Sequence, residues 1–175
     1  MDDSVVIVKG GAADVCAVMG MVQACVRQMI AQGIHQWDDV YPDRGTIERD
    51  IAEQTLFVAR DGQALCGMIV VDENQSAEYV QVTWQYVAEK VLVVHRLAVA
   101  PTWQGRGLAS RLMSFAEDYG RRYGYGAIRL DTFVHNPTAL GLYTKRQYRR
   151  AGTVRFRKGE FYCLEKSLKP EETNR

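Results

Sequence analysis

Two glycines and an arginine separate an apolar run from an amphipathic one, in the stretch Gln104-Gly105-Arg106-Gly107. The preceding run, VLVVHRLAV, is typical of a strand, and residues 104–123 have the period of a helix. The first N–H groups of a helix lack partners within it and lie at its positive end. Glycines allow a ligand to approach the backbone closely, and the arginine adds positive charge. The pattern predicts a cradle for a phosphate group.

Two common phosphate-binding loops do not fit this stretch. The dinucleotide fingerprint needs a third glycine where Ser110 stands, and it follows a first strand rather than one in mid-chain. The Walker pattern needs Gly-Lys-Ser/Thr, which is absent from the sequence. From the glycines alone, a strand-to-helix turn without a ligand explains the stretch equally well.

The residues around these glycines resemble the acetyl-CoA-binding segment of the GNAT N-acetyltransferases. The signature of that family is Arg/Gln-x-x-Gly-x-Gly/Ala, which Gln104, Gly107 and Ala109 fill, and the preceding L-A-V-x-P also matches. A second stretch, HNPTALGLYTKRQYRRAG, resembles the family's Asn-x-x-Ala-x-x-x-Tyr segment. Gln147 stands where glycine is common there, while Tyr148 keeps the aromatic residue. The resemblance covers most of the chain, from the first strand to the last hairpin.

The resemblance implies acetyl-CoA as cosubstrate and gives positions for its parts. The pyrophosphate is expected on the backbone N–H groups of Gln104, Gly105, Arg106, Gly107, Leu108 and Ala109. The pantetheine arm is expected along the backbone of Leu97, Ala98 and Val99, whose side chains are strand core in either case. The role of Arg106 is the least determined, because the family motif tolerates many residues there.

Asn136 and Tyr143 each have two interpretations. Asn136 precedes Pro137 and is a natural N-cap for a short helix, while the matching family residue binds pantetheine. Tyr143 follows two helical turns later on the same side of that helix. The family tyrosine at this place protonates the leaving thiolate of coenzyme A, and a phenol remains protonated at neutral pH. The alternative for Tyr143 is an aromatic packed on an amphipathic helix.

The implied reaction is direct attack of a neutral amine on the thioester, with a backbone N–H near Val99 as the oxyanion donor. His95 shares strand parity with Leu97 and Val99, and some relatives have a histidine at this place. A histidine side chain titrates near neutral pH, which suits a general base. A hydrogen-bonded strand histidine without a catalytic role explains His95 as well.

The acceptor site is expected to be lined by aromatic residues. In relatives, the loop after the first helix forms one wall of the acceptor site. In this sequence that loop is GIHQWDDVYPDRG. Trp37 and Tyr41 in this loop are candidates for binding a cationic amine. Trp84, with Tyr79 and Tyr86, is the candidate for an opposite wall. Hydrophobic cover over the core is the alternative for these residues. The acceptor is expected to be a small-molecule amine; the other readings are a protein or peptide amine, or a non-catalytic acyl-CoA sensor.

The elements that must position these residues follow from the periodicity. Strand-like runs lie at residues 4–10, 54–72 with a hairpin turn at Asp61-Gly62, 79–99, 125–133 and 148–168. Helical patterns lie at residues 12–32, 44–53, 104–123 and 136–147. This is an α/β (α+β) order. The resemblance implies the GNAT fold, a mixed, mostly antiparallel sheet of about seven strands, splayed in the middle and flanked by about four helices.

Bulk properties set the remaining expectations. With 175 residues, the chain suits a single domain over 1–168 and a flexible tail over 169–175. A net charge of +1 argues against nucleic acid, and no long apolar run or signal peptide is apparent, so no membrane is expected. No metal-ligand spacing occurs, so no metal is expected.

The four cysteines indicate buried, reduced thiols and a cytoplasmic protein. Relatives are often dimers, which makes a homodimer a further expectation.

Overall fold

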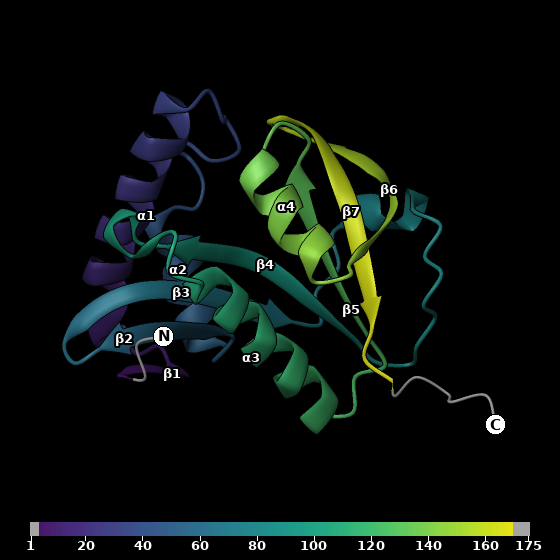
Figure 1. Ribbon diagram of the computed structural model, residues 1–175, viewed down its shortest axis with the longest axis horizontal. Coiled ribbons are helices and arrows are strands. Elements are labelled where there is room, and N and C mark those ends of the chain that lie inside the picture. Colours follow the sequence, from purple (N-terminus) through teal and green to yellow (C-terminus); the bar gives the residue numbers. More distant parts are fainter. Residues whose placement is uncertain (1–3, 170–175) are drawn as a thin grey trace. The chain divides into compact units, whose positions relative to one another are not determined.

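The computed structural model describes residues 4–169 and divides into two compact units (Figure 1). The first unit contains the residues up to Asp72 together with His95–Phe115, and the second contains Glu73–Val94 together with the residues from Ala116 onward. The predicted single domain over 1–168 stays a prediction. Of the predicted tail, Lys169 is exposed, and residues 170–175 lie outside the described residues.

The first unit is built on antiparallel strands. β1 (Val5–Lys9) pairs with β2 (Leu56–Asp61), and β2 pairs with β3 (Ala64–Asp72). The predicted hairpin joins β2 to β3, and Gly62 in its turn has φ of 55°, a value that favours glycine. The last part of β4 (Val91–Val99) also belongs to this unit.

Helices cover both faces of these strands, because the strand residues are apolar at odd and even positions alike. On one face, α1 (Val15–Ala31) and α2 (Arg44–Ala52) cover a core that continues into the strands. That core consists of Val18, Met21, Val22, Cys25, Val26, Trp37, Ile47, Leu56, Val58, Met68, Val70, Ala98 and Ala100. On the other face lies the first part of α3 (Leu108–Arg122), where the Phe115 ring is 4.8 Å from that of Phe57.

The segment Ala12–Ala31, which includes α1, is the one helical stretch within residues 4–169 that is long and apolar enough to cross a membrane. The core helix of a globular protein passes the same test of length and composition. Its buried residues pack in the core of the first unit, which favours the core-helix interpretation.

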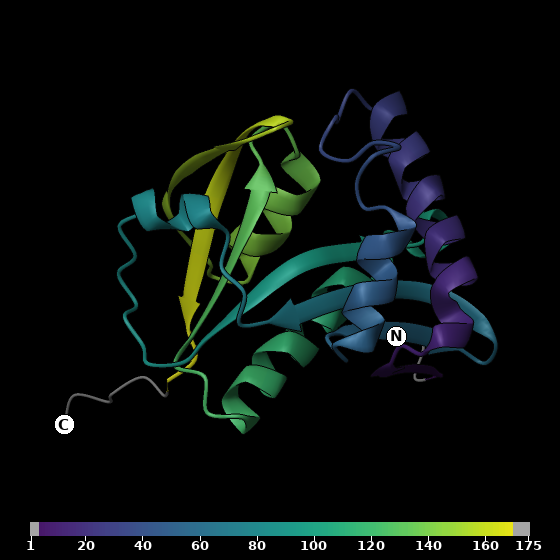
Figure 2. The same cartoon turned by 180° about the vertical axis from the view of Figure 1, so that it is seen from behind.

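The second unit contains the other half of the sheet (Figure 2). The first residues of β4 pair in parallel with β5 (Ala127–Phe133), from Val91↔Ala127 to Val94↔Leu130. β5 pairs antiparallel with β7 (Gly159–Ser167), and β7 pairs antiparallel with β6 (Arg149–Phe156). α4 (Pro137–Lys145) connects β5 to β6.

The strand order is β1-β2-β3-β4-β5-β7-β6, an open seven-stranded mixed sheet with four α-helices within the described residues. This confirms the predicted fold class. The chain order of helices and strands also matches the prediction.

Two expectations about particular segments were wrong. Residues 79–90 are not strand: a 3-10 helix occupies Ala77–Gln81, and an irregular connection leads to β4. Their valines and aromatics favour a strand by propensity, but Val80 and Val87 are exposed, while Tyr79 and Val82 are buried. Among the cysteines, Cys25, Cys66 and Cys163 are buried thiols, whereas Cys16 is exposed on α1. The helical period places Cys16 on the solvent face, which its apolar neighbours did not reveal.

Candidate active site

The Gln104-Gly105-Arg106-Gly107 loop lies between β4 and α3, as predicted. Gly105 and Gly107 have φ of 75° and 81°, and a Cβ added to either would meet no heavy atom within 4 Å. The glycines are therefore needed for backbone conformation rather than for lack of space. The N–H of Arg111 donates to the carbonyl of Gly107 at 3.1 Å, so the helix begins directly after the second glycine.

Side chains of this loop fix it to its surroundings within the first unit. Gln104 donates through Nε2 to the carbonyl of Val99 at 3.1 Å, which ties the loop to the end of β4. The guanidinium of Arg106 lies 5.0 Å from the centre of the Trp103 ring. Residues 104–107 are exposed, so their backbone is open to a ligand at the positive end of α3.

The strand before the loop has two different faces. His95, Leu97 and Val99 share one face, as predicted from parity, and Arg96 and Ala98 lie on the other. An added Cβ at Gly67 would lie 2.9 Å from the carbonyl of Ala98, so β3 approaches β4 closely at this glycine.

His95 contacts a carboxylate that the sequence reasoning missed. Its Nε2 lies 2.7 Å from Oδ1 of Asp72, and the two side chains are 19% and 12% exposed. Since a carboxylate accepts hydrogen bonds, a neutral imidazole that bonds to Asp72 carries its proton on Nε2, which leaves Nδ1 to accept one. The available signal was the position of Asp72, the first acid after the apolar run MIVV.

The opposite face of β4 holds a buried ion pair. The Nε and Nη2 atoms of Arg96 donate to the two carboxylate oxygens of Asp50 at 2.8 and 2.6 Å. Nη1 of Arg96 donates to the hydroxyl of Tyr41 at 2.5 Å, and the Tyr41 ring lies 5.8 Å from the guanidinium. Tyr41, a predicted acceptor residue, is thus held by a structural arginine. Trp37, a second predicted acceptor residue, is only 7% exposed in the core, as its alternative interpretation expects.

Asn136 and Tyr143 lie on α4 in the second unit. Oδ1 of Asn136 accepts from the N–H of Ala139 at 3.0 Å, which confirms its N-cap role. Tyr143 is 6% exposed, and its ring centre lies 5.8 Å from that of Tyr148. Burial raises the pKa of the Tyr143 phenol well above its usual range, and the charge of Asp131 raises it further. Tyr143 therefore remains a proton donor at any physiological pH.

Trp84, the third predicted acceptor residue, also lies in the second unit. Its Nε1 donates to the carbonyl of Tyr79 at 3.1 Å, and the guanidinium of Arg129 lies 4.2 Å from its ring centre. Arg129 is a further residue that the sequence reasoning missed, because arginine in a strand usually faces solvent. Within residues 4–169, no group of three or more His, Cys, Asp or Glu side chains is arranged to hold a metal ion.

Comparison with known proteins assigns the family. The sequence profile of the acetyltransferase (GNAT) family matches residues 21–148. The chain belongs to the GNAT acetyltransferase family. It is an acyltransferase that uses acetyl-CoA as cosubstrate, and the matched residues include both the glycine loop and α4.

Solved structures agree with this assignment. A putative acetyltransferase from Staphylococcus aureus is 28% identical, with a TM-score of 0.75 over 93% of this chain and 99% of that one. A GNAT family acetyltransferase from Streptococcus agalactiae is 21% identical, with a TM-score of 0.84 over 96% and 98%. YncA from Salmonella typhimurium, a putative acetyltransferase solved with acetyl-CoA, is 17% identical, with a TM-score of 0.70 over 97% of both chains. No curated protein matches the chain.

Proposed function

We propose that this GNAT enzyme transfers the acetyl group of acetyl-CoA to the primary amine of a small molecule, by direct attack of the amine on the thioester. The observation that carries the proposal is the loop of residues 104–107, where two glycines with positive φ precede the exposed N-terminus of α3. Such a terminus offers N–H donors and a positive dipole to a pyrophosphate.

The cofactor is assigned to backbone groups in this proposal. The N–H groups of Gln104, Gly105, Arg106, Gly107, Leu108 and Ala109 bind the pyrophosphate. Leu97, Ala98 and Val99 pair with the pantetheine arm, and the amide of Asn136 adds a side-chain contact beside its capping bond.

The chemistry is assigned to two side chains. His95, held at Nε2 by Asp72, takes the proton of the incoming amine through Nδ1, directly or through water. Tyr143 donates its proton to the thiolate of coenzyme A as the C–S bond breaks, and its raised pKa keeps that proton in place until then. The oxygen of the acetyl group becomes negatively charged in the tetrahedral intermediate. It then accepts a hydrogen bond from a backbone N–H near Val99.

Steady-state assays test the proposal. Thiol release from acetyl-CoA is measured with a panel of small amines, peptides with free N-termini and lysine peptides. Turnover of small amines supports the proposal, whereas turnover restricted to peptides favours the peptide alternative. Cofactor binding without turnover on any acceptor favours the sensor alternative, and the absence of any thermal shift with acetyl-CoA contradicts the cofactor assignment.

A cytoplasmic location remains part of the proposal, supported by the free thiols of all four cysteines within the described residues. A homodimer also remains a prediction, and sedimentation of the purified chain tests it.

A further inference from the structure

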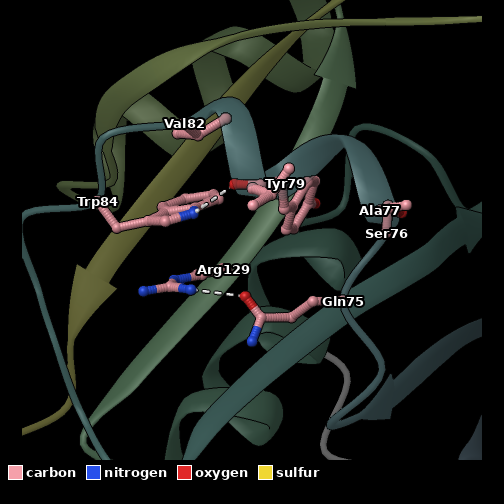
Figure 3. A pocket seen from close by; sticks show the side chains of 8 residues that line it. Gln75, Ser76, Ala77, Tyr79, Val82, Trp84 and Arg129 are labelled. Atoms are coloured by element: carbon pink, nitrogen blue, oxygen red, sulfur yellow. Dashed lines mark hydrogen bonds between the residues drawn. The ribbon is translucent and has the colours of Figure 1, made fainter.

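A pocket of about 380 Å³ lies in the second unit (Figure 3). The residues that line it are Gln75, Ser76, Ala77, Tyr79, Val80, Val82, Trp84 and Arg129. The volume is in the range of small-molecule sites. Its lining combines the apolar side chains of Ala77, Val80 and Val82 with the polar side chains of Gln75 and Arg129.

Arg129 is the charged group of this pocket. Its side chain comes from β5, and the residue is 8% exposed. The Trp84 ring covers one face of the guanidinium at 4.2 Å, as Figure 3 shows. The N–H groups in the plane of the guanidinium are the donors that a planar acceptor on a ligand would match.

Those in-plane donors are incompletely used within the described residues. Nη1 donates to Oε1 of Gln75 at 2.5 Å, and Nη2 lies 3.4 Å from the carbonyl of Tyr86, at the limit of a hydrogen bond. Nε is buried and has no hydrogen-bond partner among residues 4–169. A buried charged donor without an acceptor costs free energy, so an acceptor here would stabilise the guanidinium.

Neighbouring carboxylates do not supply it, because their oxygens have other donors. Glu165, opposite Arg129 on β7 and fully buried, accepts from the N–H groups of Gln85 and Tyr86 at 2.8 and 3.1 Å. Asp131, two residues along β5, accepts from the hydroxyl of Tyr79 at 2.8 Å. The shorter of the two hydrogen bonds described above for Arg129 is instead to the neutral amide of Gln75, which is an exposed residue.

We propose that this pocket binds the carboxylate of a small molecule, which takes the place of the Gln75 amide on the guanidinium of Arg129. A carboxylate matches the planar fork of arginine and forms stronger hydrogen bonds to it than an amide oxygen does. The apolar lining residues Ala77, Val80 and Val82 then contact a short hydrocarbon chain. The carboxylate belongs either to the acceptor amine or to a separate ligand.

Calorimetric titration of the full chain tests the site, with 4-methylpentanoate and its amide as matched probes. We expect the carboxylate to bind at least about 10-fold more tightly than the amide, because a charged acceptor replaces a neutral one. Gln75→Glu places a carboxylate of the protein itself on Arg129, so we expect at least about 10-fold weaker binding of the probe. Asn74→Asp adds the same charge at the neighbouring exposed residue. It should change the affinity for the carboxylate probe by no more than about 2-fold relative to the wild type.

Three results would overturn the site: equal affinity for acid and amide, equal effects of Gln75→Glu and Asn74→Asp, or no saturable binding of any C2–C6 monocarboxylate. Folding is checked by the melting temperature of each variant, and both changes are at exposed positions.

The source of the carboxylate is resolved by acetylation assays, which rest on the proposed function. L-leucine and isopentylamine differ only by the carboxylate. If the acceptor bears it, Gln75→Glu lowers kcat/KM for leucine and leaves isopentylamine unchanged. If a separate ligand bears it, 4-methylpentanoate binds without competing with either amine. Failure to acetylate any amine contradicts the proposed function, while the titrations still decide the site.

Discussion

Nε2 of His95 lies 2.7 Å from Oδ1 of Asp72, which joins the middle of β4 to the end of β3 within the first unit. The pair is neither fully buried nor fully exposed, with 19% and 12% of the two side chains accessible. A carboxylate that holds one imidazole nitrogen fixes the ring and determines which nitrogen accepts a proton. Asp72 is thereby a positioning residue for His95 in the proposed reaction.

Asp72→Asn tests this relationship. An asparagine can donate to Nε2, which favours the wrong tautomer, so we expect kcat to fall at least about 10-fold while KM for acetyl-CoA stays the same. His95→Gln should lower kcat by at least the same factor. The double variant should lower kcat no further than His95→Gln alone. The ¹⁵N shifts of the imidazole give a second readout, because the variant should change the protonated nitrogen. Full activity of His95→Gln would remove His95 from the mechanism.

Tyr143→Phe removes the proposed proton donor while keeping the buried ring. We expect kcat to fall roughly 100-fold or more, with the affinity for acetyl-CoA nearly unchanged. Because the raised pKa keeps the phenol protonated, the ratio of wild-type to variant kcat should be constant between pH 7 and 9. Tyr148→Phe, at the neighbouring ring, is the matched control. A large loss of cofactor affinity in Tyr143→Phe would make Tyr143 a packing residue.

Gly107→Ala tests the proposed role of the loop of residues 104–107 in binding the cofactor. The added methyl group meets no neighbour, so its cost is that of an alanine at φ of 81°, about 1 kcal/mol. Gly124→Ala is a matched control, because Gly124 has φ of 78° and equally open surroundings at the far end of α3. Both variants should lose similar stability in urea, but only Gly107→Ala should weaken acetyl-CoA binding in calorimetry. Equal cofactor affinity in the two variants would contradict the pyrophosphate assignment.

The buried Arg96–Asp50 pair should contribute strongly to the stability of the first unit. Arg96→Met leaves the Asp50 carboxylate uncompensated at 4% exposure, and we expect a loss of about 3–5 kcal/mol in urea unfolding. The control is Arg44→Met at the exposed pair with Glu48, where the side chains are 56% and 50% accessible. There the loss should stay below about 1 kcal/mol. Similar losses at both sites would show that Asp50 finds another partner.

The cysteines should differ in reactivity. A water-soluble thiol reagent at pH 8 should modify exposed Cys16 within minutes, while Cys25, Cys66 and Cys163 should react only on unfolding. Burial raises the pKa of Cys25 to about 11 and that of Cys163 to about 12, so both stay protonated at this pH. Mass spectrometry after timed quenching measures the order in which the cysteines are modified. Rapid modification of Cys25 would mean that the core of the first unit opens readily.

Local patterns in the sequence predicted most of the helices and strands and the glycine-containing loop before α3. The Asp61-Gly62 turn, the Asn136-Pro137 helix start and the two glycines before α3 each depend on the backbone preferences of a few adjacent residues. The wrong prediction for residues 79–90 also came from local preferences. The residue types there favour a strand, but a strand needs a pairing partner from elsewhere in the chain. A local pattern does not show whether such a partner is present.

Contacts between distant residues were decided only by the tertiary structure. His95 and Asp72 are 23 residues apart, Arg96 and Asp50 are 46 apart, and Arg129 meets Gln75 across 54. A single sequence determines which side chains can ionise or donate a hydrogen bond. The alternation of side chains along a strand determines which of them share a face. Which carboxylate, amide or ring stands opposite depends on strand order and register, because these bring together side chains that are far apart in the chain.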